Sequence, residues 1–303
     1  MTIEDGMFGL FLLCLASCSV AGPIGGSVWY PLPAGFNQSK PDTILGLVDH
    51  APLAFDGMYV FGDSACDTGN LFEYSGNTDP DPKAYWRGRF SNGPMWPDYL
   101  QARHQLKARN YAFGGAVVNQ KNNIVLEVPD FFEQLKAHKS LPSLGAKKPL
   151  ALIQFVGNDL INQTVTPASV SNDFKAVMQQ LIDLGEIKHF LIILTSIIDY
   201  ASLGFNRALA STADALNAAN KGNVTVQTLS VIGLYKRMIA VPPATANPKV
   251  WSRTDEYCYD MYTGKKCADP ENHLYFDNYH PSTVPNHNSA LFVSEAINRI
   301  WPH

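Results

Sequence analysis

The serine at position 64 stands where a short apolar segment gives way to small polar residues. Residues 58–61 are Met-Tyr-Val-Phe, a β-favouring run, and Gly62 and Asp63 interrupt it. We expect a buried strand that ends there and turns into a helix, with the Ser64 hydroxyl at the carboxyl end of the strand. A helix N-terminus beside it would offer N–H groups to a developing negative charge. The alternative is that Ser64 only caps that helix.

Two later stretches, like the one at Ser64, come directly after an expected strand and interrupt its apolar pattern. They are a double glycine after residues 110–113 and a Gly-Asn-Asp triplet after residues 150–156. Glycine lets the backbone turn sharply and leaves its N–H exposed. Because the carboxyl ends of parallel strands share one edge of a sheet, we expect Ser64, Gly115 and Asn158 to lie along that edge. An ordinary tight turn is the alternative for the double glycine.

One of the eight histidines has the surroundings of a general base. His280 lies in a loop-like segment bounded by proline, and Asp277 precedes it by three residues, so a local turn can bring the carboxylate to one ring nitrogen. Serine is a poor nucleophile until a base removes its proton, which histidine can do near neutral pH. His273, His280 and His287 also raise the question of a metal site, but no Glu-flanked helical His pair or Cys/His cluster accompanies them.

The segments that carry these residues alternate between strand and helix patterns. Within residues 169–184, for example, apolar side chains recur on one helical face. The other expected helices span residues 95–103, 129–138, 206–219, 232–239 and 288–300, and further strands span residues 190–194 and 224–226. Since most strands are apolar on both faces, the pattern predicts a parallel sheet covered by helices on both sides.

Length and charge limit the class of protein. The chain has 303 residues, of which 46% are apolar, enough for one large α/β domain or two small ones. Its formal net charge of −4 shows no basic excess, which argues against a nucleic-acid partner. No apolar run reaches the roughly 18–20 residues needed to cross a bilayer, so we expect no transmembrane segment in the mature chain. The sequence contains no Gly-x-Ser-x-Gly, which excludes the common α/β-hydrolase nucleophile turn.

The N-terminus resembles a secretory leader. An apolar run of signal-peptide length begins at Met7 and ends in a small-x-small pattern at residues 19–21. We predict a signal peptide at residues 1–21, an N-terminal arm at residues 22–56 and secretion of the mature chain. Two acidic residues and no Lys or Arg precede the run, which is atypical of a signal peptide. The alternatives are a buried N-terminal helix and a lipoprotein box that ends at Cys18.

Three cysteines remain beyond the predicted leader. Cys258 and Cys267 flank a turn-prone Tyr-Thr-Gly stretch, so we expect them to pair in a secreted protein. Cys66 would then be a free thiol, buried rather than reactive. Asn-x-Ser/Thr sequons, which agree with secretion and a glycoprotein, begin at Asn37, Asn162 and Asn223.

Four blocks of this sequence resemble, in order, those of the GDSL (SGNH) esterase and lipase family. The blocks are Gly62-Asp63-Ser64, Gly114-Gly115, Gly157-Asn158-Asp159 and Asp277-x-x-His280. Longer segments are similar to the subgroup that contains plant GDSL lipases and haemolysin-like bacterial enzymes, namely residues 61–70, 88–93 and 110–116. The similarity runs from about Tyr59 to the C-terminus, so we assign residues 57–303 to one SGNH hydrolase domain.

The resemblance implies a flavodoxin-like three-layer α/β/α sandwich with a mostly parallel five-stranded sheet. It also implies a serine esterase or lipase that acts on a lipid acyl ester or an acylated glycan, without a cofactor or metal. Ser64 would be the nucleophile, His280 the general base, and Asp277 the residue that orients His280.

The same resemblance implies an oxyanion hole. Its donors would be the Ser64 N–H, the Gly115 N–H and the Asn158 side-chain amide, with Gly114 as the alternative to Gly115. The sequence departs from the family pattern at Val156, where the third block usually has glycine, and we expect this to affect the loop that holds Asn158. Cys66 stands where serine is common in the family, a change of little expected consequence.

Two other functions remain open from the sequence. The first is a non-catalytic lipid- or glycan-binding protein on the same fold. The second is an acyltransferase, because an acyl-enzyme can be released by an alcohol as well as by water. The aromatic loop at residues 74–90 is expected to line an acyl groove, to stack on a sugar or simply to pack.

Overall fold

The core of the protein is a parallel β-sheet. The computed structural model describes residues 52–124, 126–195, 200–241 and 247–302. Within them, five strands pair in the order β2-β1-β3-β4-β5, and every pair is parallel. The strands are β1 (Gly57–Gly62), β2 (Lys107–Asn110), β3 (Pro149–Gln154), β4 (His189–Leu194) and β5 (Thr225–Ser230). This is the strand order of flavodoxin-like sheets, and it confirms the predicted α/β fold class.

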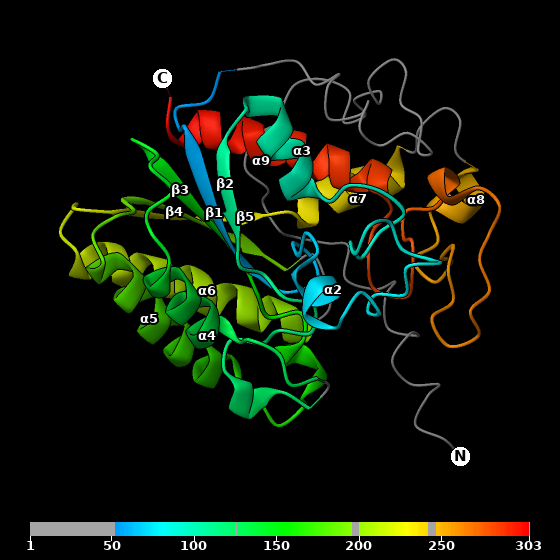
Figure 1. The fold of residues 1–303 in the computed structure, drawn as a ribbon, viewed down its shortest axis with the longest axis horizontal. Helices are drawn as coiled ribbons and strands as arrows, with labels where there is room; N and C mark the ends of the chain where they lie inside the picture. The colour runs from blue at the N-terminus through cyan, green and yellow to red at the C-terminus, as the bar shows by residue number, and fades with distance from the viewer. Residues whose placement is uncertain (1–51, 125, 196–199, 242–246, 303) are drawn as a thin grey trace.

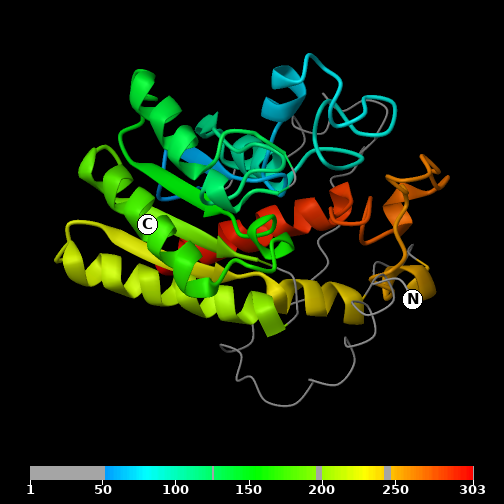
Figure 2. The same ribbon diagram turned by 90° about the horizontal axis from the view of Figure 1, so that it is seen from below.

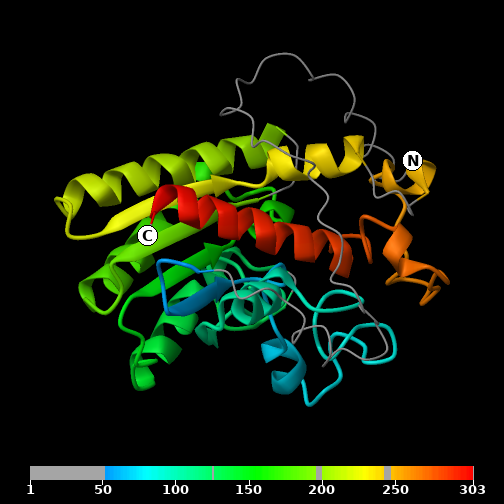
Figure 3. The same ribbon diagram turned by 90° about the horizontal axis from the view of Figure 1, so that it is seen from above.

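Helices cover both faces of the sheet (Figure 1). One layer contains α4 (Phe131–Ser140), α5 (Pro167–Asp183) and α6 (Tyr200–Ala219). The other contains α3 (Trp96–His104), α7 (Ile232–Ala240) and α9 (Thr283–Ile300). Two short helices, α2 (Asn70–Tyr74) and α8 (Pro248–Trp251), lie away from these layers, on the side where the strands end (Figures 2 and 3).

The alternation of side chains along β1 shows how the two layers are held. Met58 and Val60 pack among residues of α3, α7 and α9, whereas Tyr59 and Phe61 pack among residues of α4, α5 and α6. All four side chains are at most 2% exposed. Because successive residues of a strand point to opposite faces, a fully apolar strand is stable only between two apolar layers.

Element boundaries differ from the predictions where the local signal is weak. The strand expected at residues 110–113 is β2, which ends at Asn110. Its sequence, Lys-Ala-Arg-Asn, is partly exposed because, among the described strands, β2 lies at the edge of the sheet and pairs with β1 alone. The last helix begins at Thr283 rather than at residue 288, with Pro285 in its first turn, where a helix needs no N–H donor.

Predictions for the N-terminus concern residues that the structure describes only in part. The signal peptide at residues 1–21 and all but the last five residues of the arm at 22–56 lie outside the described residues. Among the described helices, none combines the length and apolar character that a membrane crossing requires. Cys258 and Cys267 form a disulfide, and Cys66 is a buried free thiol, as predicted.

Candidate active site

Ser64 lies in a single tight turn that follows β1. The N–H groups of Cys66 and Asp67 both donate to the Asp63 carbonyl, at 3.1 and 3.0 Å. The predicted helix does not start at Ser64, because the next helix, α2, begins only at Asn70. The Ser64 side chain is half-exposed at the edge of the sheet. Because no helix starts there, it does not cap one.

The reason for the late helix start is Asp67. Its buried carboxylate accepts the N–H groups of Gly69, Asn70 and Leu71 and so caps α2. It also accepts the Gly114 N–H at 2.8 Å, which joins the serine turn to the double glycine. Burial raises the pKa of Asp67, and these backbone donors oppose that shift.

The structure brings Ser64, His280 and Asp277 together in one chain of hydrogen bonds. His280 Nε2 lies 2.8 Å from Ser64 Oγ, across 216 residues of sequence. His280 Nδ1 lies 2.9 and 2.8 Å from the two oxygens of the Asp277 carboxylate. Asp277 is fully buried, and although burial acts to raise its pKa, His280 and its hydrogen-bond donors hold that pKa below the usual value.

The segment at residues 88–93, which resembles a motif of the family, supports the loop that carries His280. The Phe90 ring lies against the imidazole, with ring centroids 4.9 Å apart. Ser91 Oγ donates to the Pro281 carbonyl at 2.9 Å, and Asn92 Oδ1 accepts the Thr283 N–H at 2.8 Å. The Gly-Arg-Phe-Ser-Asn-Gly segment at residues 88–93 thus fixes the loop that carries the candidate base. In the sequence, this segment was recognisable only by its similarity to a family motif, because its residue types did not themselves indicate a chemical role.

One of the two N–H groups of the double glycine has no acceptor among the described residues. The Gly114 N–H is occupied by Asp67, whereas the Gly115 N–H donates to no acceptor within the described residues. Gly115 has φ of +81°, a conformation that favours glycine, and a Cβ atom there would come within 3.3 Å of Leu126. The contacts therefore favour Gly115 over Gly114 as the candidate oxyanion donor.

Asn158 lies on the turn after β3, as predicted, and is half-exposed. Its side-chain amide nitrogen donates one hydrogen to the Ala116 carbonyl at 2.8 Å, which orients the amide and leaves its second hydrogen for a ligand. The next residue, Asp159, is buried and accepts the Val118 N–H. Burial raises the pKa of Asp159 to about 6.

The departure at Val156 has a conformational consequence. Val156 has φ of +92°, a left-handed conformation that is unfavourable for a β-branched residue. Its side chain is fully buried, so packing opposes the backbone strain. Strained residues of this kind are concentrated at functional sites.

Asp63 connects the serine turn to the Asn158 turn. One carboxylate oxygen accepts the Ala65 N–H at 3.0 Å, and the other lies beside Gly157, where a Cβ atom would come within 3.1 Å of it. Burial raises the pKa of Asp63 to about 6, while His280 and the backbone donors act in the opposite direction. The buried Asp63 side chain therefore lies between the serine turn and the Asn158 turn.

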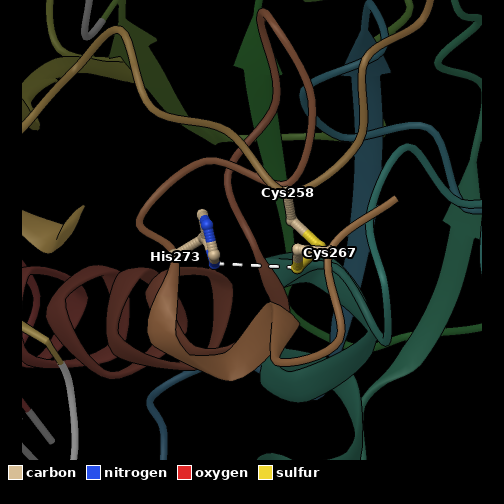
Figure 4. A group of neighbouring side chains, drawn as sticks. All are labelled: Cys258, Cys267 and His273. Atoms are coloured by element: carbon tan, nitrogen blue, oxygen red, sulfur yellow. Dashed lines mark hydrogen bonds between the residues drawn. A yellow bond between two sulfur atoms is a disulfide. The ribbon is translucent and has the colours of Figure 1, made fainter. Parts of the chain in front are cut away.

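The three histidines considered for a metal site do not form one. His280 pairs with Ser64, and His287 packs against Tyr99 with ring centroids 5.0 Å apart. Within the described residues, one group of three potential ligand atoms does lie together, from Cys258, Cys267 and His273 (Figure 4). Its two sulfur atoms are bonded to each other, so they are not thiolate ligands.

The geometry at the sheet edge has the components for acyl transfer. A serine hydroxyl faces an imidazole, the imidazole faces a buried carboxylate, and N–H donors from two other turns lie on the same edge. A base beside the hydroxyl activates it for attack on a carbonyl carbon. N–H donors can stabilise the negative charge that then forms on the carbonyl oxygen.

The sequence matches one protein family over most of its length. The family model for GDSL-like Lipase/Acylhydrolase matches residues 58–291. A thermolabile hemolysin from Vibrio parahaemolyticus serotype O3:K6 is 30% identical over 145 residues, which cover 46% of this chain and 34% of that protein. A phosphatidylcholine-sterol acyltransferase from Aeromonas hydrophila is 35% identical over 111 residues, which cover 30% of this chain and 33% of that protein. The matches thus span about a third of the length of each of these two relatives.

Solved structures with a similar arrangement have little sequence identity to this chain. A family two carbohydrate esterase from Clostridium thermocellum superposes with a TM-score of 0.48 at 12% identity, covering 82% of this chain and 66% of that chain. A lipolytic protein of the G-D-S-L family from Veillonella parvula superposes with a TM-score of 0.43 at 12% identity, covering 80% of this chain and 98% of that chain.

Proposed function

Because this chain belongs to the GDSL-like Lipase/Acylhydrolase family, we propose that it is a serine esterase that hydrolyses carboxylic esters through an acyl-enzyme. The observation that carries the proposal is the continuous contact from Ser64 through His280 to Asp277, with heavy-atom distances of 2.8 Å at each step. The residues come from the two ends of the domain, and their meeting supports catalysis over a purely structural role for Ser64.

The mechanism has two half-reactions. His280 takes the Ser64 proton as the hydroxyl oxygen attacks the ester carbonyl carbon, and the imidazolium that forms is stabilised by Asp277. The imidazolium then gives its proton to the leaving alcohol as the carbon–oxygen bond breaks, which leaves an acyl group on Ser64. In the second half-reaction, His280 takes a proton from water, whose oxygen attacks the acyl carbon. The carboxylic acid leaves as the proton returns to Ser64.

Three donors are proposed to meet the oxyanion. They are the N–H groups of Ser64 and Gly115 and the amide of Asn158, each after a different strand of the sheet. Neither N–H donates to an acceptor within the described residues, and all three residues are half-exposed, so they remain accessible to a substrate oxygen. No step of this mechanism needs a cofactor.

Asn158→Ala is expected to lower kcat by about 10²–10³-fold, as removal of a single oxyanion donor does in other enzymes. KM and the circular dichroism spectrum should change little, because the amide contributes mainly in the transition state. Steady-state kinetics on a short acyl ester measures this. Asn162→Ala is the matched control, since its amide also donates to a main-chain carbonyl, that of Asn122. Parental kcat in Asn158→Ala would remove Asn158 from the oxyanion hole and direct attention to the strained turn at Val156.

Acyl transfer to an alcohol is the second candidate. The matched Aeromonas protein is an acyltransferase, and the mechanism above differs only in whether water or an alcohol attacks the acyl-enzyme. Turnover in the presence of glycerol or a sugar separates the two, because a transferase forms a new ester while a hydrolase releases only free acid.

The substrate is proposed to be a lipid acyl ester or an acylated glycan. The direct test of the function is covalent labelling of the native protein by a fluorophosphonate, followed by hydrolysis of acyl esters of increasing chain length. A protein that is neither labelled nor active on any ester would be a binding protein on this fold, and the proposal would be wrong.

We also propose that the protein is secreted, with cleavage before Gly22. The apolar leader and the Cys258–Cys267 disulfide support this. Intact-mass measurement of protein from the medium should give a chain that begins near Gly22 and gains two hydrogens on reduction. Recovery of an intact Met1 from the medium would contradict the leader assignment. Of the three sequons, Asn223 is exposed, the Asn162 amide is engaged with Asn122, and Asn37 lies outside the described residues.

A further inference from the structure

The Asp277 carboxylate has one hydrogen-bond partner that comes from far away in the sequence. Tyr85 Oη donates to Asp277 Oδ2 at 2.6 Å, across 192 residues. The other donors to this carboxylate belong to the same short turn and are the main-chain N–H groups of Tyr279 and His280 and the His280 imidazole. Among the described residues, Tyr85 is therefore the single donor that fixes the carboxylate relative to the rest of the domain.

We infer that Tyr85 is a positioning residue for the proposed esterase reaction and that its hydroxyl holds the Asp277 carboxylate in the orientation that faces His280. This inference rests on the proposed function, since it assigns Tyr85 a role through Asp277 and His280. It also gives a role to the aromatic loop at residues 74–90, which does more than pack.

The Tyr85 ring is held on several sides. It is 6% exposed and makes edge contacts with Phe90, Tyr259 and Phe276, with ring centroids 6.0, 5.5 and 5.3 Å apart. Aromatic rings in such clusters have few alternative positions, because each edge contact restricts the ring plane. The hydroxyl is thus presented to Asp277 by a rigid support.

The main chain of the loop is held by the disulfide-bonded segment. Lys266 Nζ donates to the Ala84 carbonyl at 2.8 Å and lies over the Phe276 ring, 5.2 Å from its centroid. Lys266 is next to Cys267 of the disulfide, and Phe276 is next to Asp277. The aromatic loop at Ala84 and the disulfide-bonded segment at Lys266 are therefore held together next to the Asp277 carboxylate.

The same loop supports both members of the His–Asp pair. Tyr85 contacts Asp277, and Phe90, five residues later, lies against the His280 ring. The Trp86 N–H donates to the Ser91 carbonyl at 2.9 Å, so the two ends of this short segment are joined. Displacement of the loop would move the carboxylate and the imidazole together.

Titratable and charged groups surround Asp277. Those that face it or its partners are His280, Tyr85, Tyr259, Tyr279, Asp79 and Lys266, and Asp63 faces His280 from the β1 side. Burial first, and then Asp277, raise the pKa of Tyr85, so its hydroxyl stays protonated and remains a donor. Without this donor, the carboxylate is free to turn away from His280 Nδ1, so it orients the imidazole less well.

The test compares Tyr85→Phe with Tyr259→Phe. The control removes a hydroxyl from the same aromatic cluster but from a ring that donates nothing to Asp277. Tyr85→Phe should lower kcat on the order of tenfold, the effect of one hydrogen bond to a charged group, with KM unchanged. Tyr259→Phe should match the parent in both.

Two readouts separate this inference from the proposed function. The proton NMR resonance of the His280 Nδ1–H, which lies against Asp277, should move in Tyr85→Phe but not in Tyr259→Phe, whether or not the protein turns over esters. An active parent whose kcat and imidazole resonance are the same in Tyr85→Phe would overturn the inference alone. A parent that hydrolyses no ester and is not labelled would overturn the proposed function. Lys266→Met, with its neighbour Lys265→Met as control, should produce a smaller change in the same resonance.

Discussion

Ser64→Ala and His280→Ala are each expected to lower kcat on the order of 10⁶-fold, and neither loss should add to the other in the double variant. The hydroxyl and the imidazole act as one unit across a contact of 2.8 Å, so removing either one removes the activated nucleophile. Residual activity above the uncatalysed rate would come from the oxyanion donors and substrate binding. Ester turnover by the three variants, measured with saturating substrate, gives the comparison.

Covalent labelling distinguishes this outcome from a structural role of Ser64. A fluorophosphonate should label the parent and the control Ser252→Ala, whose exposed serine lies at the end of α8, but not Ser64→Ala. A residue that only caps local structure would lose about 1 kcal/mol of stability on substitution and would show no labelling in the parent. Labelled Ser64→Ala, or unlabelled parent that still hydrolyses esters, would overturn the assignment of the nucleophile.

Asp277→Ala is expected to lower kcat by about 10⁴-fold, less than loss of Ser64 or His280, because Asp277 orients and stabilises without attacking. The physical basis is its full burial and its contact with His280 Nδ1, which fix the ring so that Nε2 faces Ser64. Kinetics on the same ester and circular dichroism at the assay temperature measure the loss and the fold.

The matched control is Asp255→Ala, which removes an exposed carboxylate that pairs with Arg253. It should retain parental kcat, since surface ion pairs contribute little to stability. Asp277→Ala with activity within tenfold of the parent would show that the imidazole is oriented by other contacts, of which the Phe90 ring is the nearest candidate.

Features of this protein that depend on neighbouring residues were predictable from the sequence. The strands of the sheet interior are apolar on both faces, and helical periodicity marks the elements between them. The pairing of Asp277 with His280 was predictable for the same reason, since it needs only one turn of three residues. Local propensity and side-chain period set these features before the chain closes on itself.

Local pattern failed where a distant partner replaces the expected local interaction. Edge strand β2 has no apolar run because only one side of it is paired. The predicted helix at Ser64 is absent because the Asp67 carboxylate satisfies the N-terminal N–H groups of α2 several residues later. The same carboxylate occupies the Gly114 N–H, a contact across 47 residues that no motif reveals.

From the sequence came the α/β fold class, the place of Ser64 after a strand and, through the family resemblance, the identities of the candidate nucleophile, base and orienting carboxylate. The three-dimensional structure added that the Ser64–His280 contact implied by the resemblance forms, that Asp67 accepts the Gly114 N–H, and that Tyr85 reaches Asp277. The physical reason is that propensity and periodicity act over a few residues. Contacts across 192 and 216 residues depend instead on the order of the strands and on loops packed beyond their ends.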